Sequence, residues 1–213
     1  MALRHAVRTV PGCAIGMGLY IAVASAAAIS QEPARTPLAL GSARVSIAGT
    51  SNIHAYSAST TTVRVTRVQL AGGVPGPDFW DAIVKPGALE AFEIAVPAAT
   101  LSSPKEGLDK NMHKALKANE HADITFRLRR LEPRAGTPGA LRGAGLLRIA
   151  GVEREVVLDL TIARKDPGLT VQGHLNLLMT DFGITPPKAM LGMLKTDPKV
   201  TVTFETVLTI PLT

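Results

Sequence analysis

The sequence has little cysteine and few aromatic residues. Cys13 is the single cysteine in 213 residues, and aromatic residues make up only 4%. One cysteine excludes an intramolecular disulfide framework and a cysteine-based metal site. Scarce aromatic rings disfavour carbohydrate and single-stranded nucleic-acid sites, which are built on stacking platforms. The formal charge of +6 is too small to indicate a nucleic-acid-binding protein by itself. We expect no nucleic-acid partner.

The common catalytic motifs are also missing. The chain contains no H-E-x-x-H, no G-x-S-x-G and no glycine-rich phosphate loop. Asp109 and His113 are four residues apart, with His121 beyond them, a pattern that fits a solvated helix face better than a weak metal site. A nucleophile and a base can still meet by folding, so a hydrolase stays as a minor alternative. We predict a protein that is not an enzyme, with no catalytic residue, metal or cofactor.

Residues 1–28 have the layout of a secretory signal peptide. Arg4, His5 and Arg8 form a positive start, and the uncharged apolar run Val10–Ala24 leads into a cluster of alanines. This pattern predicts cleavage between about residues 26 and 28 and secretion of the mature chain. An uncleaved membrane anchor is the alternative, because the apolar run is long.

Residues 29–41 contain two prolines and show no periodicity, so we expect a flexible lead-in to a single domain over residues 42–213. Within that domain, apolar and polar residues alternate in one segment after another. Strict alternation is typical of strands with one buried and one solvated face. The predicted strands cover residues 43–47, 56–70, 92–96, 123–129, 156–162, 169–179 and 199–210.

Turn signals rich in glycine and proline separate these strands, and no strand–helix repeat is present. This pattern disfavours a parallel doubly wound sheet. Many long antiparallel strands with one apolar face favour an all-β fold that closes into an up-and-down barrel, because closure leaves no edge exposed. We predict an all-β, antiparallel up-and-down β-barrel with one or two short helices.

Two segments interrupt the strand pattern. Ser103 to Glu106 reads as a capping box with proline at the first helical position. Leu108, Met112 and Leu116 then share one helix face. A second, shorter helix is predicted over residues 188–195 after a pair of prolines. We expect both helices to pack on the barrel or across one of its mouths.

Three stretches together resemble one known family. The first is residues 49–58, the second runs from 108 to 126, and the third is residues 180–184 followed by Pro186-Pro187 and Gly192. In this order, behind a signal peptide, they resemble the YceI-like family of secreted bacterial proteins, over about residues 42–212. The chain departs from the family pattern at Tyr56, where the family often has tryptophan soon after the histidine of the first motif.

The resemblance implies an antiparallel, lipocalin-like β-barrel with an elongated apolar lumen that binds a polyisoprenoid, an isoprenoid quinone or a similar long-chain lipid. The function predicted is sequestration or transport of that lipid in the periplasm, with no cofactor besides the bound ligand. The sequence leaves open whether the protein contacts a membrane transiently and whether it forms a homodimer. Without the resemblance, the residues also fit a barrel whose interior is filled by its own side chains and has no room for a ligand.

We assign candidate ligand-binding residues on the inward positions and at the strand ends. His54 and Asp181 are the polar candidates for a head group, although each also fits a purely structural role. Phe182 is a candidate plug, and the methionines are candidate lid contacts because methionine adapts to variable apolar ligands. The full set is His54, Phe92, Ile94, Phe126, Leu128, Leu158, Leu160, Val171, Leu175, Leu177, Asp181, Phe182, Met190, Met193, Val202 and Phe204.

A module without a ligand is the remaining alternative. Arg127, Arg129 and Arg130 lie on a predicted strand and could meet an anionic lipid or a partner in a stress response or another interaction. A run of charges on a strand is more often only a solvated face.

Overall fold

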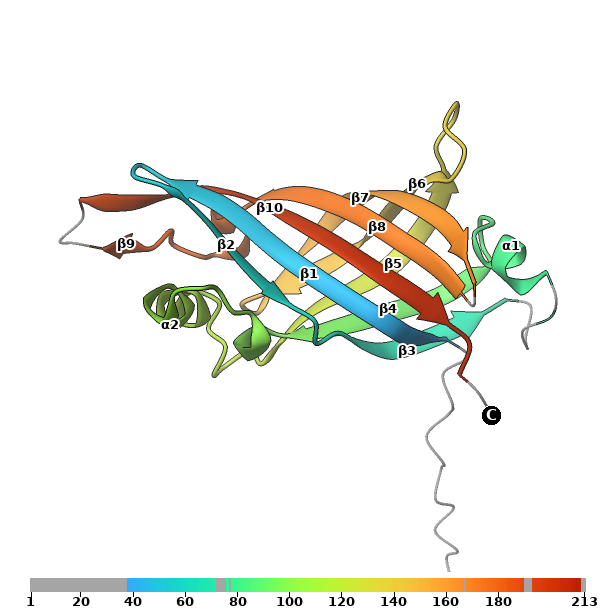
Figure 1. Cartoon of the computed structure of the whole chain (residues 1–213), viewed down its shortest axis with the longest axis horizontal. Helices are drawn as coiled ribbons and strands as arrows, with labels where there is room; N and C mark the ends of the chain where they lie inside the picture. The colour runs from blue at the N-terminus through green and yellow to red at the C-terminus, as the bar shows by residue number, and fades with distance from the viewer. Residues whose placement is uncertain (1–37, 72–75, 77, 167, 190–192, 212–213) are drawn as a thin grey trace, which may run out of the picture. The chain divides into compact units, whose positions relative to one another are not determined.

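A computed structural model describes residues 38–211, apart from 72–75, 77, 167 and 190–192. Strands dominate the described residues, as the alternating pattern predicts (Figure 1). The strands are β1 (Ala39–Ser51), β2 (Ala55–Thr60), β3 (Arg64–Leu70), β4 (Leu89–Pro97), β5 (Asp123–Pro133), β6 (Ala140–Ile149), β7 (Val152–Lys165), β8 (Gly168–Leu178), β9 (Lys188–Ala189) and β10 (Leu194–Thr209). The helices are α1 (Phe79–Ile83) and α2 (Glu106–Ala115), with the 3₁₀ turns η1 (Ala98–Thr100) and η2 (Met179–Phe182).

The strands form one curved antiparallel sheet. Its order is β2-β1-β10-β8-β7-β6-β5-β4-β3, and β9 pairs with the start of β10. Nearly every neighbour in this order is also a neighbour in sequence, as in an up-and-down barrel, with β10 returning to pair with β1. The predicted antiparallel, lipocalin-like barrel is confirmed.

The barrel has a seam between the two ends of the sheet. In the described part of the chain, no ladder joins β2 to β3, although β3 lies against β1. Ser59 on the outer edge of β2 instead exchanges two backbone hydrogen bonds with Ser102, at 2.8 and 3.0 Å. The Thr60 and Thr100 hydroxyls bond each other at 2.8 Å beside this bridge. The segment that leads into α2 therefore covers an edge that would otherwise be unpaired.

The two helices lie at opposite ends of the barrel (Figure 1). At one end, Phe79, Trp80 and Ile83 of α1 pack with Leu38 and Leu208 in a buried cluster. The other end carries α2, the β1–β2 turn and the β9–β10 hairpin. A second buried cluster supports that end and consists of Ala98, Leu101, Leu116, Ile149, Ala150, Phe182 and Ile184.

The sequence prediction was wrong for the helix expected over residues 188–195 and for the first residue of α2. Lys188–Ala189 is a strand that pairs with Leu194 and Lys195, so the predicted helix over 188–195 does not form. The long strand β10 begins inside that segment, and tertiary pairing outweighs the local helix signal. In α2, Lys105 and not Ser103 is the N-cap. The Ser103 hydroxyl instead donates to the Lys105 carbonyl and accepts from its amide.

The lead-in prediction was wrong for residues 38–41. Strand β1 begins at Ala39, and Leu38 is fully buried against α1. The rest of the predicted lead-in and the predicted signal peptide lie outside the described residues. Strand β6 and helix α1 were missed. The glycines of β6 interrupt the alternation, and α1 has only five residues, too few to show a helical period.

Candidate ligand-binding lumen

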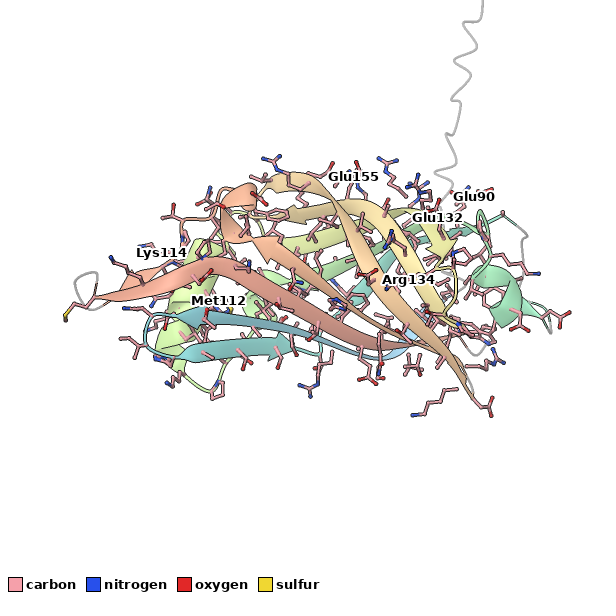
Figure 2. All side chains as sticks on the ribbon, turned by 90° about the horizontal axis from the view of Figure 1, so that it is seen from above. Glu90, Met112, Lys114, Glu132, Arg134 and Glu155 are labelled. Carbon is pink, nitrogen blue, oxygen red and sulfur yellow. The ribbon has the colours of Figure 1, made fainter. Side chains whose placement is uncertain are left out.

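The barrel encloses an apolar cavity of about 220 Å³. Its wall is built from the inward positions of the strands, and Arg44, Glu205 and Thr206 are the only non-apolar residues among those that line it. Charged side chains instead lie around the outside, where Glu132, Arg134 and Glu155 are seen in Figure 2. Such a wall offers almost no hydrogen-bonding partner to water and suits a hydrocarbon chain.

The structure places ten of the predicted residues on the wall of this cavity. They are Phe92, Ile94, Phe126, Leu128, Leu158, Leu160, Val171, Leu175, Val202 and Phe204. Period-two alternation found them because the side-chain period of a strand is two, so one correct position assigns the whole face. Leu38, Ile83 and Val84 also line the cavity and were missed, since they lie beside or within α1.

A second cavity of about 650 Å³ lies at the α2 end and forms the mouth of the lumen. It is bounded by β1, β2 and α2, and four residues border both cavities: Ile47, Ile124, Ile149 and Val202. The two spaces therefore lie next to each other along the barrel. His54 and Leu177 of the predicted set line this mouth, together with Tyr56, Ser57 and Lys105, which the site prediction omitted.

Four predicted residues do not contribute to the described wall. Asp181 is exposed on η2 and borders neither cavity. Phe182 is 2% exposed, but it packs in the cluster behind the mouth and not in the lumen. Met193 is 66% exposed at the hairpin. Met190 lies outside the described residues. The 3₁₀ turn and the hairpin leave the strand pattern, so alternation could not place these side chains.

Two glycines make room for aromatic rings inside the lumen. Gly173 lies opposite Phe204 on β10, and a Cβ at Gly173 would overlap the Phe204 ring. On β6, a Cβ at Gly145 would come within 2.6 Å of the Phe126 ring. Each ring therefore lies across a neighbouring strand, where a larger residue would push it further into the cavity.

The mouth carries one perturbed titratable group. The Tyr56 hydroxyl is buried, and no hydrogen-bond partner for it is found in the described part of the chain. Burial raises the pKa of the Tyr56 phenol, and the negative charge of Asp197 raises it further. The phenol is therefore neutral at physiological pH and keeps its proton as a donor. The His54 ring borders the same cavity, while its backbone holds the β1–β2 turn through Ser51.

Asp109 and His113, the two α2 residues considered above for a weak metal site, make hydrogen bonds that hold α2 in place. The Asp109 carboxylate accepts a hydrogen bond from the Ser103 amide at 2.8 Å, and His113 Nε2 donates to the Leu101 carbonyl at 2.8 Å. Both bonds tie α2 to the segment that covers β2. Among the described residues, no group of three or more histidine, cysteine, aspartate or glutamate side chains is arranged to hold a metal ion.

Two of the three arginines named on strand β5 have carboxylate partners. Arg127 pairs with Glu153 at 2.6 Å and Arg130 with Glu132 at 3.0 Å, all partly or largely exposed. Such pairs are typical of a solvated sheet face. Within the described ranges, no helix has both the length and the apolar character needed to cross a membrane.

The model of the YceI-like domain matches residues 44–208, which is most of the chain. The chain belongs to the YceI-like family. Solved structures agree with the fold. BcnA of Burkholderia cenocepacia is similar at 15% identity, with a TM-score of 0.61 over 78% of this chain and 95% of that one. A polyisoprenoid binding domain from Saccharophagus degradans, implicated in plant cell wall breakdown, is similar at 12% identity, with a TM-score of 0.58 over 83% and 100%.

A third solved structure, the YCEI protein of Campylobacter jejuni, is similar at 16% identity with a TM-score of 0.51 over 77% of this chain and 85% of that one. A comparison with curated protein sequences found no match. Sequence identities this low support a shared fold, but they do not indicate which ligand this chain binds.

Proposed function

We propose that this protein binds a long-chain isoprenoid or isoprenoid quinone in its barrel and sequesters or carries it in the periplasm. The observation that supports this most is the apolar lumen joined to a partly polar mouth. The solved polyisoprenoid binding domain with the same fold adds support. Each buried CH₂ contributes about 0.8 kcal/mol, so a partly buried prenyl chain reaches micromolar affinity after the cost of association.

The length of the lumen favours a long chain. On β10 the wall extends from Thr196 in the mouth to Leu208 near α1. At about 3.3 Å per residue and a tilt of about 40°, this segment spans roughly 30 Å of barrel. The hydrocarbon core of a bilayer is also about 30 Å thick, so a lipid tail of one leaflet covers about 15 Å. An ordinary acyl chain would fill about half of the lumen, whereas a polyisoprenoid fills more of it.

The protein would act by binding and not by catalysis. A hydrocarbon wall supplies neither a nucleophile nor a base to the enclosed chain. Export through the predicted signal peptide would bring the lumen to a compartment between two membranes, where an apolar lipid needs a carrier. Amino-terminal sequencing of the protein recovered from a periplasmic fraction tests this location. A retained segment 1–28 would contradict it.

We also propose that the mouth contacts membranes. Ile53 in the β1–β2 turn and Met193 in the β9–β10 hairpin are 59% and 66% exposed. Asn52 joins the two tips, because its side chain donates to the Met193 carbonyl and accepts from the Lys195 amide, both at 2.8 Å. Exposed Lys195 lies beside the tips, and exposed Asp197 and Lys199 follow it along β10. Apolar tips beside lysines suit an anionic bilayer surface.

Vesicle sedimentation tests this contact. Ile53→Ser and Met193→Ser should each weaken binding to vesicles that contain phosphatidylglycerol. Val157→Ser is the matched control, since Val157 is 50% exposed on the barrel wall, in strand β7. Equal loss in all three variants would contradict docking through the mouth.

The central experiment is native mass spectrometry of the protein purified from its own periplasm, followed by organic extraction and lipid identification. We expect one isoprenoid lipid per barrel. In the variant Val202→Phe, a larger side chain at the junction of the two cavities should block loading. Thr203→Phe places the same side chain on the exposed neighbouring position and should load normally. A barrel that is empty and also rejects added prenyl lipids would overturn the proposal.

A further inference from the structure

The Tyr56 hydroxyl lies on the lumen face of the barrel. Gly49 and Tyr56 are paired across β1 and β2, and a Cβ at Gly49 would overlap the hydroxyl. Gly49 is two residues from Ile47, which lines both cavities, so that Cβ would point to the same face. The ring therefore crosses β1 inside the mouth. Its hydroxyl is directed toward the next strand, where Val200 pairs with Gly49.

This hydroxyl lacks a hydrogen-bond partner in the described part of the chain, although it is buried. An unsatisfied buried hydroxyl is costly, and a group of this kind calls for an explanation such as a ligand atom. Ile47, Val200 and Val202 line the same mouth, and their side chains have no hydrogen-bond acceptor. A neutral phenol can donate one hydrogen bond to an oxygen that enters from the cavity.

The charges near the hydroxyl favour an uncharged acceptor. The Asp197 carboxylate is the charge that acts on the phenol, and it raises the pKa of Tyr56 further than burial does alone. The same negative charge would repel a phosphate at that position. His54 and Lys105 are the other titratable side chains that line the mouth, and both are solvent-exposed. Their attraction for an anion is therefore weakened by water and salt.

We propose that the Tyr56 hydroxyl is a head-group site, where it donates a hydrogen bond to a carbonyl oxygen of an uncharged lipid head group, as in a prenylated quinone. This inference rests on the proposed function, since it assumes that the tail occupies the lumen. It narrows the ligand class from apolar isoprenoids in general to isoprenoids that end in a neutral acceptor. The tail would then extend from the mouth toward α1.

The test compares three probes on delipidated protein: a prenylated benzoquinone, a polyprenyl hydrocarbon with the same number of isoprene units, and the matching polyprenyl phosphate. Tyr56→Phe should weaken quinone binding by about 3- to 10-fold, the equivalent of one net hydrogen bond. Hydrocarbon binding should change by less than about twofold, because the ring and its packing remain. The unmodified protein should bind the quinone more tightly than the phosphate.

Thr170→Val is the matched control, since it removes another buried hydroxyl without a partner among the described residues, at a position that borders neither cavity. It should leave all three affinities unchanged. Equal changes for quinone and hydrocarbon in Tyr56→Phe, or a preference for the phosphate, would overturn the head-group site while the carrier function stands. Failure of the unmodified protein to bind any of the three probes would overturn both proposals.

Discussion

At the scale of single residues, Tyr56 can be observed by itself. The chain has two tyrosines, and Tyr20 lies in the predicted signal peptide, so the processed protein would keep Tyr56 alone. Its phenolate absorbance should titrate with a midpoint above the ordinary value of 10, because burial and Asp197 disfavour the anion. A midpoint at or below 10 would contradict the buried hydroxyl. The Tyr56→Phe protein should show no phenolate signal.

The same shift predicts how stability changes at high pH. The folded-state pKa of Tyr56 is raised, so its contribution to stability is complete below pH 10. The contribution is lost as the pH rises from 10 toward the folded-state pKa, since the unfolded chain ionises first. Urea unfolding followed by the fluorescence of the single tryptophan, Trp80, measures this effect. The decline should be smaller in Tyr56→Phe than in the unmodified protein.

A pair of glycine substitutions should change stability in opposite directions. Gly173→Ala forces the Phe204 ring away from its position and should destabilise the fold by about 1–3 kcal/mol. Gly107→Ala on α2 meets nothing within 4 Å and should stabilise by up to about 1 kcal/mol. Urea denaturation gives both values. Equal effects would show that the Phe204 ring is free to move aside.

At the scale of elements, Asn52 couples two hairpins that are far apart in sequence. Asn52→Ala removes two side-chain hydrogen bonds at the joined tips and keeps the backbone bond from its amide to the Lys195 carbonyl. We expect faster hydrogen exchange at the Lys195 amide and a loss of about 1–2 kcal/mol. Ser42→Ala, at an exposed position near the opposite end of β1, is the control. Unchanged exchange at Lys195 would contradict the coupling.

The elements also show where local signals succeed and fail. The helix around Met112 was predictable from its period, and the structure has it as α2. The segment 188–195 also has a local pattern that predicts a helix, but its two ends pair with each other as the β9–β10 hairpin. Strand β6 was missed because Gly143 and Gly145 replace inward apolar residues. The reason for these glycines is visible only in the fold, where they leave room for the Phe126 and Leu160 side chains of neighbouring strands.

At the scale of the whole molecule, lipid binding should stabilise the barrel. A ligand that binds only the folded state contributes about 2.7 kcal/mol at one hundred times its Kd. The Tm of the delipidated protein should therefore rise with the concentration of added prenylated quinone. The Val202→Phe barrel should show no such rise, and the Thr203→Phe barrel should match the unmodified one. A Tm that does not depend on lipid would contradict occupation of the lumen.

The sequence by itself determined the strand faces, and with them most of the lumen wall. Phe126, Leu175 and Phe204 could be assigned because a strand has a period of two and one face must be apolar. The family was also readable from ordered motifs, which do not depend on knowing the contacts. Lumen residues that lie on regular strands were therefore predictable without the fold.

Only the tertiary structure decided which polar group faces the lumen. Asp181 and Tyr56 both lie in motifs of the sequence, yet Asp181 is exposed outside the lumen while the Tyr56 hydroxyl is buried within its mouth. The difference arises from the pairing of Tyr56 with Gly49 across two strands and from the position of α2 over the mouth. Such contacts join segments that are distant in sequence, so the hydrophobic periodicity within one segment cannot reveal them.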